Sequence, residues 1–238
     1  MNTNQPPRIF DDAHASAEGS LAKNFVANVF SWMVVGLLIT GFVASYAASS
    51  DLYKQLVGSG GLMMWVILLS PFAFIIAMNA GLQKFSTTTL TILFLAFSGV
   101  MGLSLSSVFL VYSMGSITQV FLITAGTFAV MAFAGYTTSV DLSKFGALLF
   151  MALIGIIIAS VVNFFMQSSM MEFIISVGGV LVFTGLTAYD TQRIKRIGAG
   201  VEYGTAGATK LAILAAVSLY LNFVNLFLFL LRLLGGRN

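Results

Sequence analysis

Long apolar runs separated by short polar connections dominate the pattern along the chain. Each run holds about the 20 residues, or more, that a helix needs to cross the hydrocarbon core of a bilayer. Runs such as ALLFMALIGIIIASVVNFFM do not alternate between apolar and polar residues, as a transmembrane β-strand would. The pattern therefore predicts an all-α membrane protein with seven transmembrane helices. The runs cover residues 25–48, 61–80, 87–112, 118–137, 147–166, 171–192 and 210–234.

The segment before the first run is polar and contains two adjacent prolines and three acidic residues. This composition predicts a mobile tail over residues 1–23, followed by one transmembrane domain over residues 24–238. The first run is long enough to span the membrane, so an uncleaved helix is favoured over a signal peptide. Cleavage near Ala47, where small residues gather, is the alternative.

Basic residues predict the orientation, although charged residues make up only 8% of the chain. Cytoplasmic connections of membrane proteins carry an excess of Lys and Arg, and eight basic residues share the side of the amino terminus, against three on the other. We therefore expect a cytoplasmic amino terminus and an external carboxyl terminus. So few basic residues also exclude a nucleic-acid-binding surface. The eight are Arg8, Lys23, Lys84, Lys144, Arg193, Lys195, Arg196 and Lys210, and the three are Lys54, Arg232 and Arg237.

Asp190, in the stretch GLTAYDTQRIK, is the one acidic residue that we place within the membrane, where the sixth run approaches the cytoplasmic side; Asp51, Asp141, Glu172 and Glu202 lie at the ends of runs or in the connections. A charge inside the membrane is costly, so such a residue is a functional candidate. The alternative is a helix-end residue paired with Arg193, three positions further on, because residues at that spacing share a helical face.

The seventh run carries a polar face. Ala215, Ser218, Asn222 and Asn225 follow one another at spacings of three, four and three residues, among leucines and phenylalanines. Buried amides need hydrogen-bond partners. We therefore expect this face to lie against another helix or a water-filled cavity.

The inventory of reactive side chains argues against an enzyme. The one histidine, His14, lies in the tail, and the chain has no cysteine. Tyr189 and Asp190 form a YD pair like that of intramembrane aspartyl proteases, but those enzymes need a second membrane carboxylate. The seventh run has no lysine in its apolar core for a retinal Schiff base. The sequence predicts no catalytic residue, no cofactor and no metal centre.

Five stretches of the chain resemble the Bax inhibitor-1 family, in its bacterial YccA-like branch. The resemblance implies seven helices with the last one surrounded by the other six, in the inner (plasma) membrane, and a pH-sensitive calcium leak. Eukaryotic relatives are linked to suppression of cell death, and some bacterial relatives to regulation of a membrane-bound protease. The stretches are SGVMGLSLSSVFLVY, FAGYTTSVDLSKFG, MALIGIIIASVVNFF, GLTAYDTQRIK and LYLNFVNLFLFLLRLLGGR.

The family's pH sensor is described as two facing aspartates, one in a YD element and one in an LYLDF element. Asp190 matches the first, whereas the second position is Asn222, in LYLNF. We therefore expect the Asn222 amide to hydrogen-bond the Asp190 carboxylate, and the gate to respond weakly to pH. A basic latch described in relatives has only Lys84 as a counterpart, in GLQKFS, and Lys84 and Arg193 are the candidate salt-bridge partners of Asp190.

Two functions follow from these residues. The first is a leak channel for calcium or other cations, with Asp190, Ser218, Asn222 and Asn225 along the path. Calcium takes six to eight oxygen ligands, so one carboxylate with amides would bind it weakly. The second is a non-transporting regulator of other membrane proteins, such as a membrane-bound protease, with the tail and the Gly-rich connection 195–210 as contacts. Besides these ions or proteins, the bilayer itself is the expected partner.

Overall fold

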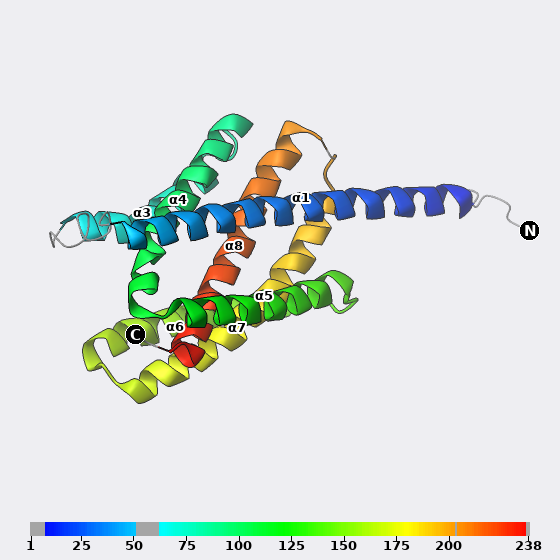
Figure 1. Ribbon diagram of the computed structural model, residues 1–238. Helices are drawn as coiled ribbons and strands as arrows, with labels where there is room; N and C mark the ends of the chain where they lie inside the picture. Colours follow the sequence, from blue (N-terminus) through cyan, green and yellow to red (C-terminus); the bar gives the residue numbers. More distant parts are fainter. Residues whose placement is uncertain (1–7, 51–61, 203, 237–238) are drawn as a thin grey trace, which may run out of the picture.

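The computed structural model describes residues 8–50, 62–202 and 204–236, and within them every regular element is a helix (Figure 1). The prediction of an all-α fold is confirmed. Six helices are long and apolar enough to cross a membrane, and α3 is a shorter apolar helix. The helices are α1 (Arg8–Ser49), α3 (Leu62–Ala80), α4 (Thr87–Val111), α5 (Met114–Thr137), α6 (Ser143–Met166), α7 (Ser169–Ala199) and α8 (Ala206–Leu234).

Two helices extend further than the hydrophobic pattern predicts. Helix α1 begins at Arg8, so much of the predicted mobile tail is helical. Helix α7 continues to Ala199, seven residues beyond the end of its apolar run. The Gly-rich connection, predicted over residues 195–210, is therefore reduced to residues 200–205. The reason is packing, because Ile194 and Gly198 are buried, and Gly198 lies so close to Phe25 of α1 that a Cβ would come within 2.8 Å of it.

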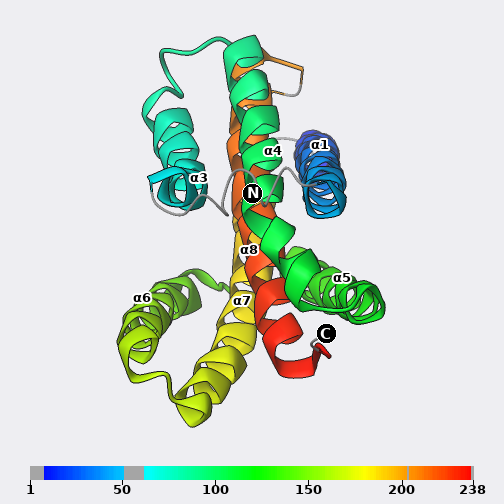
Figure 2. The ribbon, with the colours of Figure 1, turned by 60° about the vertical axis from the view of Figure 1, so that its left-hand side comes forward.

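Helix α8 lies at the centre of the bundle. Figure 2 shows it running through the middle, with α3 and α6 on one side and α1 and α5 on the other. It packs against α1, α3, α4, α5 and α7, whereas α6 packs mainly on α7. Leu219, Tyr220 and Leu226 of α8 are fully buried. The resemblance therefore predicts the central last helix correctly.

A polar network joins three helices inside this core. The Thr40 hydroxyl of α1 donates to the Ser98 carbonyl of α4 at 2.9 Å, and the Tyr220 hydroxyl of α8 lies 2.7 Å from the same Thr40 oxygen. Since Thr40 has already used its proton, Tyr220 is the donor. Each polar group is thus satisfied, which matters where water is excluded.

Helix α3 contains an internal proline, and the backbone carbonyl that this proline leaves unpaired accepts a hydrogen bond from α4. Pro71 has no N–H and leaves the carbonyl of Ile67 without its helical partner. The hydroxyls of Ser70 and Ser104 donate to that carbonyl at 3.0 and 2.9 Å, and Ser104 belongs to α4. The hydrogen bond that Pro71 removes from α3 is thus replaced in part by a hydrogen bond between α3 and α4.

The orientation in the membrane stays a prediction, and Lys54 and Arg237, which enter its basic count, lie outside the described residues. Seven crossings would place the two termini on opposite sides. We expect an alkaline phosphatase fused after residue 238 to be active, and one fused before residue 1 to be inactive. Equal activity of both fusions would contradict seven crossings.

Candidate functional site

Asp190 of α7 is buried in the bundle and faces α8. Its side chain is 6% exposed, and that of Asn222 is 5% exposed. The Asn222 Nδ2 group donates to Asp190 Oδ2 at 2.7 Å. The predicted hydrogen bond between the two residues is therefore confirmed, and an amide stands where a second carboxylate would face the first.

The candidate salt-bridge partners of Asp190 do not pair with it. Arg193 lies one turn further along α7 and is exposed, and within the described residues it forms no ion pair. Lys84 is exposed in the turn between α3 and α4. The Asp190 carboxylate is thus held by an amide rather than by a cation.

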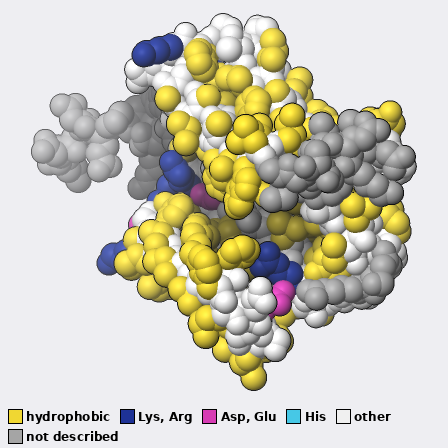
Figure 3. Space-filling view, turned by 90° about the vertical axis from the view of Figure 1, so that its left-hand side faces the viewer, with side chains coloured by type: hydrophobic (Ala, Val, Ile, Leu, Met, Phe, Trp, Pro, Cys, Tyr) yellow, Lys and Arg dark blue, Asp and Glu magenta, His cyan; other side chains and the backbone are white. Residues whose placement is uncertain are grey.

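Two cavities meet at Asp190. The larger, of about 600 Å³, lies between α3 and α6 over a floor of α7 and α8, and the smaller, of about 260 Å³, lies among α3, α7 and α8. Asp190, Arg193 and Ser218 line both cavities, and Lys84 lines neither. Figure 3 shows a hollow near the middle of one face, surrounded mostly by hydrophobic side chains.

The polar face of α8 is divided between different partners. Asn222 binds Asp190, whereas the Asn225 amide donates to the Leu221 carbonyl of its own helix at 2.8 Å. Asn222 and Asn225 line the larger cavity, Ala215 lines the smaller one, and Ser218 lines both. The predicted polar face therefore lies along cavities, as the sequence indicates.

These residues offer oxygen ligands but too few for tight binding. One carboxylate, two amides and one hydroxyl fall short of the six to eight oxygens that calcium takes. In the described part of the chain, no three His, Cys, Asp or Glu side chains group closely enough to hold a metal ion. The arrangement suits brief contact with a cation better than its storage.

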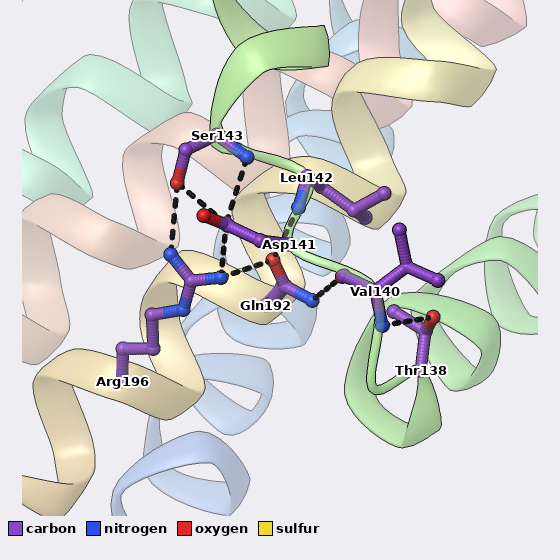
Figure 4. A network of polar contacts seen from close by, with 7 residues as sticks. All are labelled: Thr138, Val140, Asp141, Leu142, Ser143, Gln192 and Arg196. Atoms are coloured by element: carbon purple, nitrogen blue, oxygen red, sulfur yellow. Dashed lines mark hydrogen bonds and ion pairs between the residues drawn. The ribbon is translucent and has the colours of Figure 1, made fainter.

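A second polar cluster, missed by sequence reasoning, holds the connection between α5 and α6 against α7. We call it the clasp: residues 140–143 held by Gln192 and Arg196 (Figure 4). Gln192 donates to the Val140 carbonyl at 2.7 Å and accepts from the Leu142 N–H at 2.9 Å. Gln192 is only 7% exposed, so this side chain satisfies two backbone groups that lack helical partners.

Arg196 completes the clasp from the next turn of α7. Its guanidinium donates to Asp141 Oδ1 at 2.5 Å, to the Ser143 hydroxyl at 2.8 Å and to Gln192 Oε1 at 2.7 Å. Gln192 and Arg196 are four residues apart and so share a helical face. That signal is readable only once α7 is known to extend beyond residue 192.

We expect the two halves of the clasp to contribute unequally to stability. Gln192→Leu leaves two backbone groups unpaired and should lower the free energy of unfolding by about 1–3 kcal/mol. Arg196→Gln should have a smaller effect because exposed ion pairs contribute little. Thermal melting of the detergent-solubilised variants checks this order. A larger loss for Arg196→Gln would contradict it.

The clasp should be insensitive to pH near neutrality. The hydrogen bond from Arg196, with those from Ser143, holds the pKa of Asp141 well below its ordinary value of 3.8. A lowered pKa in the folded state adds stability above pH 3.8 that is lost as the pH falls further. The stability difference between the parent and Asp141→Asn should thus stay constant between about pH 5 and 8. A difference that varies there would contradict this account.

Comparison with known proteins agrees with this architecture. Residues 22–238 match the model of the family described as "Inhibitor of apoptosis-promoting Bax1". The chain is 45% identical over 216 residues to the inner membrane protein YbhL of Escherichia coli K12, covering 90% of this chain and 92% of that protein. It is also 45% identical over 218 residues to an uncharacterized protein of Borreliella burgdorferi, covering 91% and 94%. The chain is therefore a multi-pass membrane protein that belongs to the Bax inhibitor-1 family.

Proposed function

We propose that this protein is a weak cation leak of the inner membrane, with calcium as the main ion. The observation that carries the proposal is the buried carboxylate of Asp190 at the meeting point of two cavities. A charged group inside a membrane is costly and is retained mainly where ions or protons pass. The name of the Escherichia coli relative supports the location.

The route runs from the smaller cavity past Asp190 and Ser218 into the larger one. A cation on this route meets the Asp190 carboxylate, which no basic side chain of the described residues neutralises through an ion pair. Arg193 lines the same junction, and its positive charge disfavours cations there. A slow leak, rather than a fast channel, is the expected result.

We further propose that the leak responds weakly to pH and that the protein has no catalytic activity. Asn222 has nearly the shape of a protonated aspartic acid but cannot ionise. Asp190 is therefore the only titrating group where the two cavities meet. The ionised Asp190 carboxylate still accepts the hydrogen bond from Asn222, and hydrogen bonds to a charged acceptor are strong. Opening thus lacks the repulsion that two facing carboxylates would supply.

Reconstitution of the purified protein into liposomes tests the proposal. We expect calcium entry into liposomes that contain a trapped indicator and no other protein, at a rate above that of protein-free liposomes. Circular dichroism must show that the reconstituted protein is helical. Folded protein without calcium entry would contradict the leak and favour a non-transporting regulator of other membrane proteins.

A further inference from the structure

The larger cavity opens sideways toward the bilayer. Its two sides are α3 and α6, which do not pack closely against each other and stand apart in Figure 2. Phe72 of α3 and Ile157 of α6 line the cavity and are also 62% and 54% exposed. Since the exposed apolar faces of these helices meet lipid, the cavity is continuous with the hydrocarbon layer.

The shape of the cavity matches one layer of acyl chains. Along α8 its lining extends from Ser218 to Phe229, a separation of about 16 Å at the helical rise of 1.5 Å per residue. Half of a bilayer's hydrocarbon core measures about 15 Å. Apolar side chains from α3, α4, α6, α7 and α8 form most of the wall.

One end of the cavity carries the positive charge of Arg193, which lies near Asp190 but not within ion-pair distance of it. Arg193 lines the cavity, is exposed, and forms no ion pair within the described residues. The neighbouring Asp190 carboxylate accepts a hydrogen bond from Asn222 instead. The Arg193 guanidinium donates no hydrogen bond within the described residues, and a guanidinium can bind a phosphate group through two hydrogen bonds.

We propose that the larger cavity binds one acyl chain of an anionic membrane phospholipid, with the lipid phosphate at Arg193. The bound chain covers Asp190 and Asn222 on the side of the bilayer. While it is bound it closes the larger cavity to ions, so the route past Ser218 is open only when the chain has left. This lipid site stands on the geometry of the cavity and holds whether or not the protein conducts ions.

Tryptophan fluorescence with brominated lipids tests the acyl chain. The chain has only two tryptophans, Trp32 and Trp65, so a background with both changed to phenylalanine can carry a single probe. Leu228→Trp places the probe in the cavity wall. We expect lipids brominated along the acyl chain to quench this probe, and aqueous acrylamide to leave it almost unquenched.

Two controls set the scale of quenching. A variant that keeps only Trp65, which is 55% exposed on α3, gives the quenching expected for contact with bulk lipid. A variant with Phe128→Trp as its only tryptophan, at a core position that is 3% exposed, gives the quenching expected without lipid contact. Phe229→Trp, an aromatic exchange in the same wall, replaces the Leu228 probe if that variant does not fold. Quenching no greater than that of the Phe128 probe, or strong quenching by acrylamide, would overturn the proposal.

Lipid composition tests the head group. In the parent background, brominated anionic lipid should quench the cavity probe at about one fifth of the concentration that brominated zwitterionic lipid requires, because one basic residue near a membrane surface favours anionic lipid by about 1 kcal/mol. Arg193→Gln should remove this preference, while Lys144→Gln, an exposed cation outside the cavity, should retain it. Equal quenching by both lipids in the parent would overturn the assignment of an anionic head group.

Discussion

Asn222→Asp is expected to convert a weak pH response of the calcium leak into a steep one. Asn222 Nδ2 lies 2.7 Å from Asp190 Oδ2, so the variant places two carboxyl groups in contact. Two unit charges about 4 Å apart repel by about 4 kcal/mol at an effective dielectric constant of 20. The pair can therefore share a proton at low pH, whereas loss of that proton at high pH drives α7 and α8 apart.

The measurement is calcium entry into liposomes between about pH 5 and 8, a range in which coupled carboxyl groups titrate. If only about 1.4 kcal/mol of the repulsion favours the open state, the leak of the variant should change about tenfold across this range. Asn225→Asp is the matched control, because it adds a carboxyl group to the same cavity at a residue that bonds its own helix. Equally steep profiles for the parent and Asn222→Asp would show that position 222 is not part of the sensor.

Asp190→Asn is expected to reduce the calcium leak by about tenfold or more. At about 4 Å a carboxylate attracts even a monovalent cation by about 4 kcal/mol at an effective dielectric constant of 20, and each 1.4 kcal/mol corresponds to a factor of ten. The substituted amide still offers an oxygen to the Asn222 N–H. The variant should therefore fold, whereas Asp190→Ala would leave a buried donor unpaired, at a cost of about 1–3 kcal/mol.

Glu202→Gln serves as the control for this loss of charge. Glu202 is exposed in the connection between α7 and α8 and lines neither cavity. Its variant should leak like the parent, at the same density of reconstituted protein. An unchanged leak in Asp190→Asn, with normal helicity and melting temperature, would reduce Asp190 to a structural residue that joins α7 to α8.

The fold is largely predictable from the sequence because lipid limits the choices. Every backbone polar group inside a bilayer must find a partner within the protein, so long apolar runs form helices. Helix ends are less predictable, as α7 shows. Its last turns are polar, and they stay helical because Ile194 and Gly198 are buried in the bundle, with Gly198 packed against α1.

The candidate site is predictable only in part. Asp190 stands out as an acid within an apolar run, and its contact with Asn222 follows from the family resemblance. The clasp could not be foreseen, since Gln192 and Val140 are 52 positions apart in the sequence. The two cavities depend on how α3 and α6 stand around α8, and a hydrophobic pattern does not specify that spacing.

Cysteine modification at Ser218 tests the central claim, that ions pass the junction between the two cavities. Ser218 lines both cavities, and the chain has no native cysteine, so Ser218→Cys provides one reactive thiol at that point. Ser106→Cys is the matched control, because Ser106 is fully buried and lines neither cavity. We predict that a small cationic thiol reagent modifies Ser218→Cys and abolishes its calcium leak, while Ser106→Cys stays unmodified and leaks as before. Complete modification of Ser218→Cys with an undiminished leak would contradict the proposed route.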